Sequence, residues 1–121
     1  MDERKVAIVI PAFNEQETIY KEVQSVKENG IVIVVNDASI DDTKKRALKA
    51  GAIVVSHKIN KGYDGALNSG FMKANELDCD IIITFDADGQ HDPHVIKKFI
   101  MLINSGYDVV IGIRSNFQRI S

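Results

Sequence analysis

The chain of 121 residues is long enough for one domain with a hydrophobic core, and short for two. Its 45% hydrophobic and 26% charged residues are typical of a globular protein in water, and a net charge of −2 argues against a nucleic-acid partner. The single cysteine, Cys79, excludes an internal disulfide and a metal site made of cysteines. No apolar run approaches the roughly 20 residues of a membrane helix, and no signal-peptide core precedes the first strand-like segment. The expected location is therefore the cytoplasm.

Short apolar runs predict five strands. Four of them cover residues 6–10, 31–35, 52–56 and 109–113, and the fourth in chain order runs from residue 81 to Asp86. The first run is ended by Pro11, which cannot donate to a sheet ladder. Because the runs lack alternation of apolar and polar residues, each strand is expected to be buried on both faces.

Helical patterns separate the predicted strands. The first has a capping-box-like start at Asn14 and Glu17 and stops at residues 29–30. The second is capped by Ser39 or Asp41 and ends before Gly51, and the third covers residues 65–77. The fourth starts at residues 92–93 and ends at Gly106, and its buried stripe is expected to contain Ile96, Phe99, Ile100 and Ile103. Alternating strands and helices predict one α/β domain over residues 1–121, with a Rossmann-like, mainly parallel sheet and helices on both faces.

Two carboxylates, Asp86 and Asp88, stand where the fourth strand is expected to end. Acids this close repel each other unless a cation, a shared proton or strong donors compensate. Oxygen ligands of this kind suit Mg²⁺ or Mn²⁺, which often share a phosphate-bearing substrate with the protein. The alternative is a polar turn, because Asp-Gly pairs are common in turns.

The other predicted strands also end in polar or special residues. These are residues 11–15, 36–37, 60–62 and 114. In open parallel sheets, ligands bind at the carboxyl ends of the strands, whereas the opposite turns of this chain look like plain connectors. This asymmetry favours a binding site over a simple turn at Asp86 and Asp88.

Together these motifs resemble the nucleotide-sugar-binding half of the family 2 glycosyltransferases of the GT-A fold. The similarity is greatest to the branch of polyprenyl-phosphate sugar transferases, and it covers nearly everything from residue 6 to residue 114. The matching pieces, in order, are Pro11-Ala12-Phe13-Asn14-Glu15, residues 35–43, Asn60-Lys61-Gly62, residues 66–70, residues 86–91, and Gly112-Ile113-Arg114.

The resemblance implies roles for individual residues. Phe13 would pack on the nucleotide base, and Glu15 and Asp37 would hydrogen-bond the ribose and base. Asp88 would ligate Mg²⁺ or Mn²⁺, with Asp86 at the ribose or a metal-bound water and Gln90 as a further oxygen ligand. Arg114 would grip the phosphates. The full predicted nucleotide site contains Pro11, Ala12, Phe13, Glu15, Asp37, Asp86, Ala87 and Asp88, with Asp86, Asp88 and Arg114 in the catalytic roles.

The implied reaction is an inverting transfer of a sugar from a UDP- or GDP-sugar to an acceptor. The cation and Arg114 would neutralise the charge that grows on the departing diphosphate. The branch suggests a lipid-phosphate acceptor at the cytoplasmic face of a membrane. The family keeps its general base in its second, acceptor half, which the matching segment of this chain does not include.

Several residues depart from the family pattern or have a structural interpretation. Asn36 stands where many relatives have aspartate, and Asp64 where they often have glycine or a basic residue. Asp41 and Asp42 are expected to be first-turn helix acids. His57 is expected to lie in a loop outside any cluster, and Lys61 to be solvated. His91 and His94 are expected at the surface of a helix start.

Two alternative functions stay open from the sequence. The chain could be a non-catalytic nucleotide-sugar-binding or assembly module, or a phosphatase of the haloacid dehalogenase type, whose nucleophile motif the segment 85–89 imitates. The latter motif should lie on the first strand and be followed by threonine, whereas here Gln90 follows on the fourth. A fifth strand left as an open edge would also favour homo-oligomers or aggregation.

Overall fold

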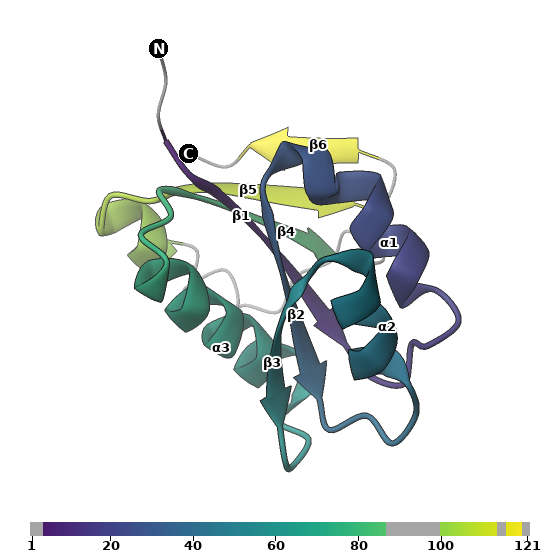
Figure 1. Cartoon of the computed structure of the whole chain (residues 1–121). Helices are drawn as coiled ribbons and strands as arrows, with labels where there is room; N and C mark the ends of the chain where they lie inside the picture. Colours follow the sequence, from purple (N-terminus) through teal and green to yellow (C-terminus); the bar gives the residue numbers. More distant parts are fainter. Residues whose placement is uncertain (1–3, 87–99, 114–115, 120–121) are drawn as a thin grey trace.

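The computed structural model describes residues 4–86, 100–113 and 116–119. Its strands form one sheet in the order β3-β2-β1-β4-β5-β6 (Figure 1). The strands are β1 (Val6–Ala12), β2 (Ile31–Asp37), β3 (Ile53–His57), β4 (Ile81–Asp86), β5 (Asp108–Ile113) and β6 (Asn116–Arg119). The first five run parallel and β6 pairs antiparallel with β5. The predicted Rossmann-like α/β sheet is confirmed.

Helices cover both faces of this sheet, as predicted. They are α1 (Ile19–Val26), the short 3-10 helix η1 (Lys27–Asn29), α2 (Thr43–Ala50) and α3 (Gly62–Glu76). In Figure 1, α1 and α2 lie on one face and α3 lies on the other. Two buried clusters follow from this arrangement, one under α1 and α2 around Ile8, Ile19 and Val34, and one under α3 around Val9 and Leu67.

Helix α3 packs very close to the sheet at Gly70. A Cβ atom placed on this glycine would lie 2.3 Å from Cγ1 of Val9 and 3.3 Å from Cγ2 of Val35. A glycine inside a helix normally costs stability, so its presence here is explained by the close approach of backbone to strand side chains. This contact fixes the height of α3 above the sheet.

Helix ends follow the predictions in part. Gly51 adopts a left-handed conformation (φ 104°) directly after α2, as expected of a glycine that ends a helix. The capping box predicted at Asn14 is wrong, because α1 begins at Ile19 and the Asn14 side chain accepts a hydrogen bond from the N–H of Ile40 instead. A tertiary contact replaces the expected local one.

Two predictions at the C-terminal side need correction. The strand β5 is not an open edge, since β6 pairs with it, so an exposed β5 edge gives no reason to expect association. Residues 100–104 are helical, and Ile103 packs against the core as predicted. Ile100 is half exposed, contrary to the prediction, and Leu102 packs against the core in addition. Ile96 and Phe99 lie outside the described residues. Among the described helices, none has both the length and the apolar character needed to cross a membrane.

Candidate functional site

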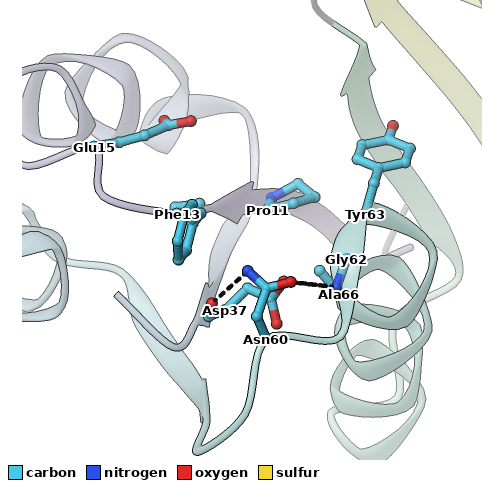
Figure 2. Close-up of a pocket in the computed structure, with 9 residues that line it drawn as sticks. Pro11, Phe13, Glu15, Asp37, Asn60, Gly62, Tyr63 and Ala66 are labelled. Carbon is cyan, nitrogen blue, oxygen red and sulfur yellow. Dashed lines mark hydrogen bonds between the residues drawn. The ribbon is translucent and has the colours of Figure 1, made fainter. Parts of the chain in front are cut away.

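A cavity of about 300 Å³ lies at the carboxyl ends of β1 and β2 and the start of α3 (Figure 2). It is lined by Pro11, Ala12, Phe13, Glu15, Asp37, Asn60, Gly62, Tyr63 and Ala66. The cavity therefore brings together the predicted nucleotide-site residues whose side chains the structure describes, namely Pro11, Ala12, Phe13, Glu15 and Asp37. A crevice outside the carboxyl ends of the strands is where open α/β sheets bind ligands.

Asp37 is the most buried acid of the cavity, with 4% of its surface exposed. Its Oδ1 accepts hydrogen bonds from the N–H of Lys61 (2.8 Å) and from Nδ1 of His57 (2.7 Å), and its Oδ2 accepts from the N–H of Gly62 (2.9 Å). Burial acts to raise the pKa of Asp37, but the His57 side chain and the two backbone donors outweigh it and lower the pKa below its usual value. The cavity thus contains a carboxylate that stays ionised.

The acceptor capacity of Asp37 is mostly used within the protein. A carboxylate offers about four lone-pair positions, and three are taken by His57, Lys61 and Gly62. Asn60 adds to the same junction, because its Nδ2 donates to the backbone oxygen of Asp37 (3.3 Å) and its Oδ1 accepts from Gly62 (3.0 Å) (Figure 2). Asp37 therefore orders the start of α3 in addition to facing the cavity.

The prediction that His57 is a loop residue outside any cluster is wrong. His57 is the last residue of β3, and its side chain is 6% exposed. Its Nε2 lies 2.7 Å from Oγ of Ser69 in α3, and its Nδ1 contacts Asp37. Sequence reasoning missed this cluster because its members are separated along the chain by 20 and 12 residues.

Phe13 and Glu15 follow β1 and line the side of the cavity away from α3 (Figure 2). Phe13 lines the cavity with 49% of its surface exposed, so its ring is accessible to a ligand. The segment that carries both residues is tied to the β2–α2 connection, because the N–H groups of Asn14 and Glu15 donate to Oγ of Ser39 and Oγ1 of Thr43, each at 2.8 Å. Two connections thus fix this wall.

Asp41 also joins the segment after β1 to the β2–α2 connection. Its carboxylate accepts hydrogen bonds from the N–H groups of Thr43 (3.0 Å) and Gln16 (3.3 Å) and from the Thr43 hydroxyl. Partial burial acts to raise the pKa of Asp41, and the bonds to Thr43 and Gln16 lower it overall. Asp42 occupies the cap position of α2 without a side-chain cap bond. The prediction of two first-turn acids is therefore wrong by one turn position, since α2 begins at Thr43, Asp42 is its cap residue and Asp41 precedes the cap.

Asn36, which departs from the family pattern, is also buried. Its Nδ2 donates to Oγ of Ser56 (3.3 Å) and its Oδ1 accepts from the N–H of Ser39 (3.2 Å). An amide serves these two contacts at once, since it carries both a donor and an acceptor. Its role in the described part of the chain is therefore to join β2 to β3 and to the β2–α2 connection.

The acid pair is only partly described. Strand β4 ends at Asp86, whose backbone pairs in register with Ile113, the residue before Arg114. Because Val9 pairs with Thr84, β4 ends at the same edge as the cavity-lining end of β1. Ala87, Asp88, Gln90, His91, His94 and Arg114 lie outside the described residues. Within the described ranges, no group of three or more His, Cys, Asp or Glu residues is placed to hold a metal ion.

Four cavity residues were not among the predicted site residues: Asn60, Gly62, Tyr63 and Ala66. The segment 60–62 matched a family motif without an assigned role, and its place after the third strand was the available signal. Ala66 likewise begins a matched piece, residues 66–70, without an assigned role. Tyr63 gave no signal, because a helical residue reaches the cavity only through the orientation of α3. Lys61 is exposed, as predicted, and contributes its backbone N–H.

The sequence of residues 7–119 matches the family described as Glycosyl transferase family 2. The chain belongs to this family. Membership confirms the resemblance seen in the motifs and overturns the alternative interpretation as a haloacid dehalogenase-type phosphatase. The parallel sheet, with its cavity at the carboxyl edge, agrees with the GT-A-type architecture expected for a family 2 glycosyltransferase.

Relatives of this family 2 chain include two named transferases. A UDP-N-acetylglucosamine–dolichyl-phosphate N-acetylglucosaminyltransferase of Methanococcus voltae is 35% identical, over 94% of this chain and 53% of the relative. An undecaprenyl-phosphate 4-deoxy-4-formamido-L-arabinose transferase of Proteus mirabilis is 34% identical, over 94% and 38%. An uncharacterized protein of Methanocaldococcus jannaschii is 42% identical, over 91% and 46%.

The chain therefore spans about half, or less, of the length of the curated relatives it matches. Among solved structures, the glucosyl-3-phosphoglycerate synthase of M. tuberculosis is similar, with 34% identity and a TM-score of 0.48. That similarity covers 54% of this family 2 chain and 28% of the synthase.

Proposed function

We propose that this chain is the nucleotide-sugar-binding part of an inverting glycosyltransferase that uses a UDP- or GDP-sugar as donor. The observation that carries the proposal is the cavity at the carboxyl ends of β1 and β2, which combines the half-exposed ring of Phe13 with the buried, ionised carboxylate of Asp37. An aromatic face stacks on a base, and a carboxylate accepts base N–H or ribose O–H groups. These are the contacts a nucleoside requires.

The geometry of Asp37 limits how it meets the donor. Lys61, Gly62 and His57 occupy three of its acceptor positions, which leaves capacity for one hydrogen bond, at Oδ2. We propose that this position takes a single donor from the nucleoside. Glu15, on the opposite wall of the cavity, provides the second carboxylate for the ribose or base.

A divalent cation fits the residue types at the end of β4 and directly after it in the sequence. Asp86, Asp88 and Gln90 supply only oxygen donors, which suit Mg²⁺ or Mn²⁺, and Asp86 ends the strand adjacent to β1. When bound, the cation would supply positive charge to the leaving diphosphate. Arg114, which follows the register partner of Asp86, would bind the same phosphates through its guanidinium group.

The proposed acceptor is a polyprenyl phosphate presented at the cytoplasmic face of a membrane. This acceptor is supported by two relatives, from Methanococcus voltae and Proteus mirabilis, whose names describe transferases for dolichyl phosphate and undecaprenyl phosphate. We propose that the relatives carry their catalytic base and their acceptor contacts in the part of their sequence that this chain does not span.

Nucleotide and metal titrations test the proposal. UDP or GDP with Mn²⁺ is expected to raise the melting temperature of the chain, and Asp88→Asn is expected to abolish the part of the increase that depends on Mn²⁺. Glu28→Gln is the matched control, because Glu28 is an exposed acid of η1, at the opposite edge of the sheet. Absence of a shift with both nucleotides in the presence of Mn²⁺ would refute the proposal.

A further inference from the structure

Asp37 and His57 form the last register pair of β2 and β3. Side chains alternate between the two faces of a sheet, so this pair lies on the same face as the pair two residues earlier, Val35 and Val55. Val35 and Val55 pack in the cluster beneath α3. The intervening pair on the other face, Asn36 and Ser56, is joined by its own hydrogen bond. At this edge, β2 and β3 therefore end in two polar residue pairs, and α3 covers the ionisable pair, Asp37 and His57.

The contacts of His57 define its tautomer. An ionised carboxylate only accepts hydrogen bonds, so Nδ1 of His57 must carry the proton that is shared with Asp37 at 2.7 Å. In the neutral ring, Nε2 is then an acceptor, and the hydroxyl of Ser69 donates to it at 2.7 Å. His57 thus links a strand-end carboxylate to the third turn of α3.

The order Ser69–His57–Asp37 is that of a serine hydrolase triad, but its placement argues for another role. Neither Ser69 nor His57 lines the cavity, and Ser69 lies within α3, with its hydroxyl directed to His57. A nucleophile must be able to reach its substrate. The chain Ser69–His57 therefore lies behind the cavity wall, where it can orient Asp37 without contacting a ligand.

Asp37 transmits this orientation to the cavity. It accepts from the N–H groups of Lys61 and Gly62, the cap and first residue of α3, and Gly62 lines the cavity. Negative charge at a helix N-terminus is stabilising, so the carboxylate also holds the first turn that carries Tyr63. A rotated Asp37 would release one cavity wall and turn its remaining acceptor position away from the ligand.

We propose that His57 is a positioning residue for nucleotide binding, which acts through Asp37 and is itself held by Ser69. The proposal rests on the proposed function only in naming a nucleotide as the ligand. The role of His57 in fixing Asp37 and the start of α3 belongs to the ligand-free protein as well. The two parts can therefore be tested separately.

Binding of UDP and of GDP, each with MnCl2, tests the first part by calorimetry on the full chain. His57→Phe keeps a ring but removes both polar contacts, and is expected to weaken the better nucleotide about tenfold, the scale of one lost hydrogen bond to a charged group. His57→Asn returns a donor near the place of Nδ1 and is expected to restore affinity to within about threefold of the original chain. Ser69→Ala should give an intermediate loss.

Val23→Ala is the control for a merely structural effect. Val23 is fully buried in α1, on the opposite face of the sheet from His57, so its truncation should lower the melting temperature without changing nucleotide affinity. If His57→Phe binds nucleotide as tightly as the original chain, or if Val23→Ala at equal loss of melting temperature weakens binding as much, the positioning role is wrong.

Nuclear magnetic resonance tests the second part without any ligand. Nitrogen-15 spectra of the histidine ring should show Nδ1 of His57 protonated and Nε2 unprotonated in the neutral form. His57→Phe should accelerate amide hydrogen exchange at Lys61 and Gly62 while leaving the exchange of β1 unchanged. A neutral ring with its proton on Nε2, or unchanged exchange at both amides, would overturn the inference. Failure of the original chain to bind either nucleotide would refute the proposed function alone, and the spectra would still decide the role of His57.

Discussion

The hydroxyl of Thr43, fully buried at the start of α2, accepts a hydrogen bond from the backbone N–H of Glu15 at 2.8 Å across 28 residues of sequence. The same hydroxyl contacts Asp41, whose carboxylate also accepts from Gln16. One side chain therefore ties the segment after β1 to the segment after β2. This junction holds the cavity wall that carries Phe13 and Glu15.

Thr43→Val is expected to lower the free energy of unfolding by about 1–3 kcal/mol. The valine keeps the shape but leaves the N–H of Glu15 and the Asp41 carboxylate each short of a partner. Urea unfolding at pH 7 measures the change. Thr18→Val is the control, because Thr18 is exposed and makes no side-chain cap bond, so its effect should stay within about 0.5 kcal/mol. Equal effects of the two variants would contradict this account.

Thr84→Val, unlike Thr43→Val, should not lower the free energy of unfolding. Thr84 is fully buried in β4, and its Oγ1 has no hydrogen-bond partner among the described residues. Replacing a buried hydroxyl that lacks a partner with a methyl group of the same shape is neutral or stabilising, by up to about 1 kcal/mol. The same urea titration measures it. A loss of more than about 1 kcal/mol would show that the hydroxyl is hydrogen-bonded in the folded protein.

Asp37→Asn is expected to reduce stability at pH 7 and to flatten the acid side of the stability profile. The amide replaces one acceptor with a donor that would face the N–H of Gly62 or the ring of His57, at a cost of about 1–3 kcal/mol. Because the pKa of Asp37 is lowered in the folded state, its contribution is present above the unfolded value of about 4 and is lost as the pH falls through the folded pKa.

Urea midpoints of both proteins between pH 7 and pH 2 measure this profile. The original chain should lose more stability than Asp37→Asn as the pH falls below about 4, so the two curves should converge in acid. Glu28→Gln, a change of an exposed acid, should run parallel to the original chain. Parallel curves for Asp37→Asn and the original chain would mean that Asp37 titrates alike in the folded and unfolded states.

Gly70→Ala is expected to destabilise the protein although alanine favours helices. Its Cβ would lie 2.3 Å from Cγ1 of Val9, and overpacking of about 1–3 kcal/mol exceeds the helix gain of about 1 kcal/mol. Removing the obstructing methyl groups should relieve the strain, so Val9→Ala/Gly70→Ala should be more stable than the sum of its single variants. Additive effects of the two changes would contradict the close contact between α3 and β1.

Phe13→Ala is expected to weaken UDP or GDP binding about tenfold or more, with little change in stability. Phe13 is 49% exposed at the cavity, so it has little packing to lose, whereas base stacking contributes about 1–3 kcal/mol. Calorimetry with Mn²⁺ present measures affinity. Tyr20→Ala provides the comparison, as Tyr20 is 41% exposed on α1 and does not line the cavity. Similar losses in both variants would exclude a specific stacking role for Phe13.

The five parallel strands could be predicted from sequence to within one or two residues, because each is a short apolar run that ends at polar or special residues. The prediction of residues 6–10 for β1 and 109–113 for β5 differs from the structure only at the ends. Strand β6 was missed because the segment 116–119 is mostly polar and pairs through its backbone with β5. Backbone pairing leaves no mark in a hydrophobic pattern.

The order of residues along the chain determined the parallel α/β sheet and the edge at which Phe13, Glu15 and Asp37 meet, since carboxyl ends of parallel strands share one side. The tertiary structure alone decided what those residues contact. Asn14 bonds Ile40 instead of its own helix, and His57 lies buried between Asp37 and Ser69. Such contacts depend on how α2 and α3 pack on the sheet, and side chains distant in sequence carry no local signal of their partners.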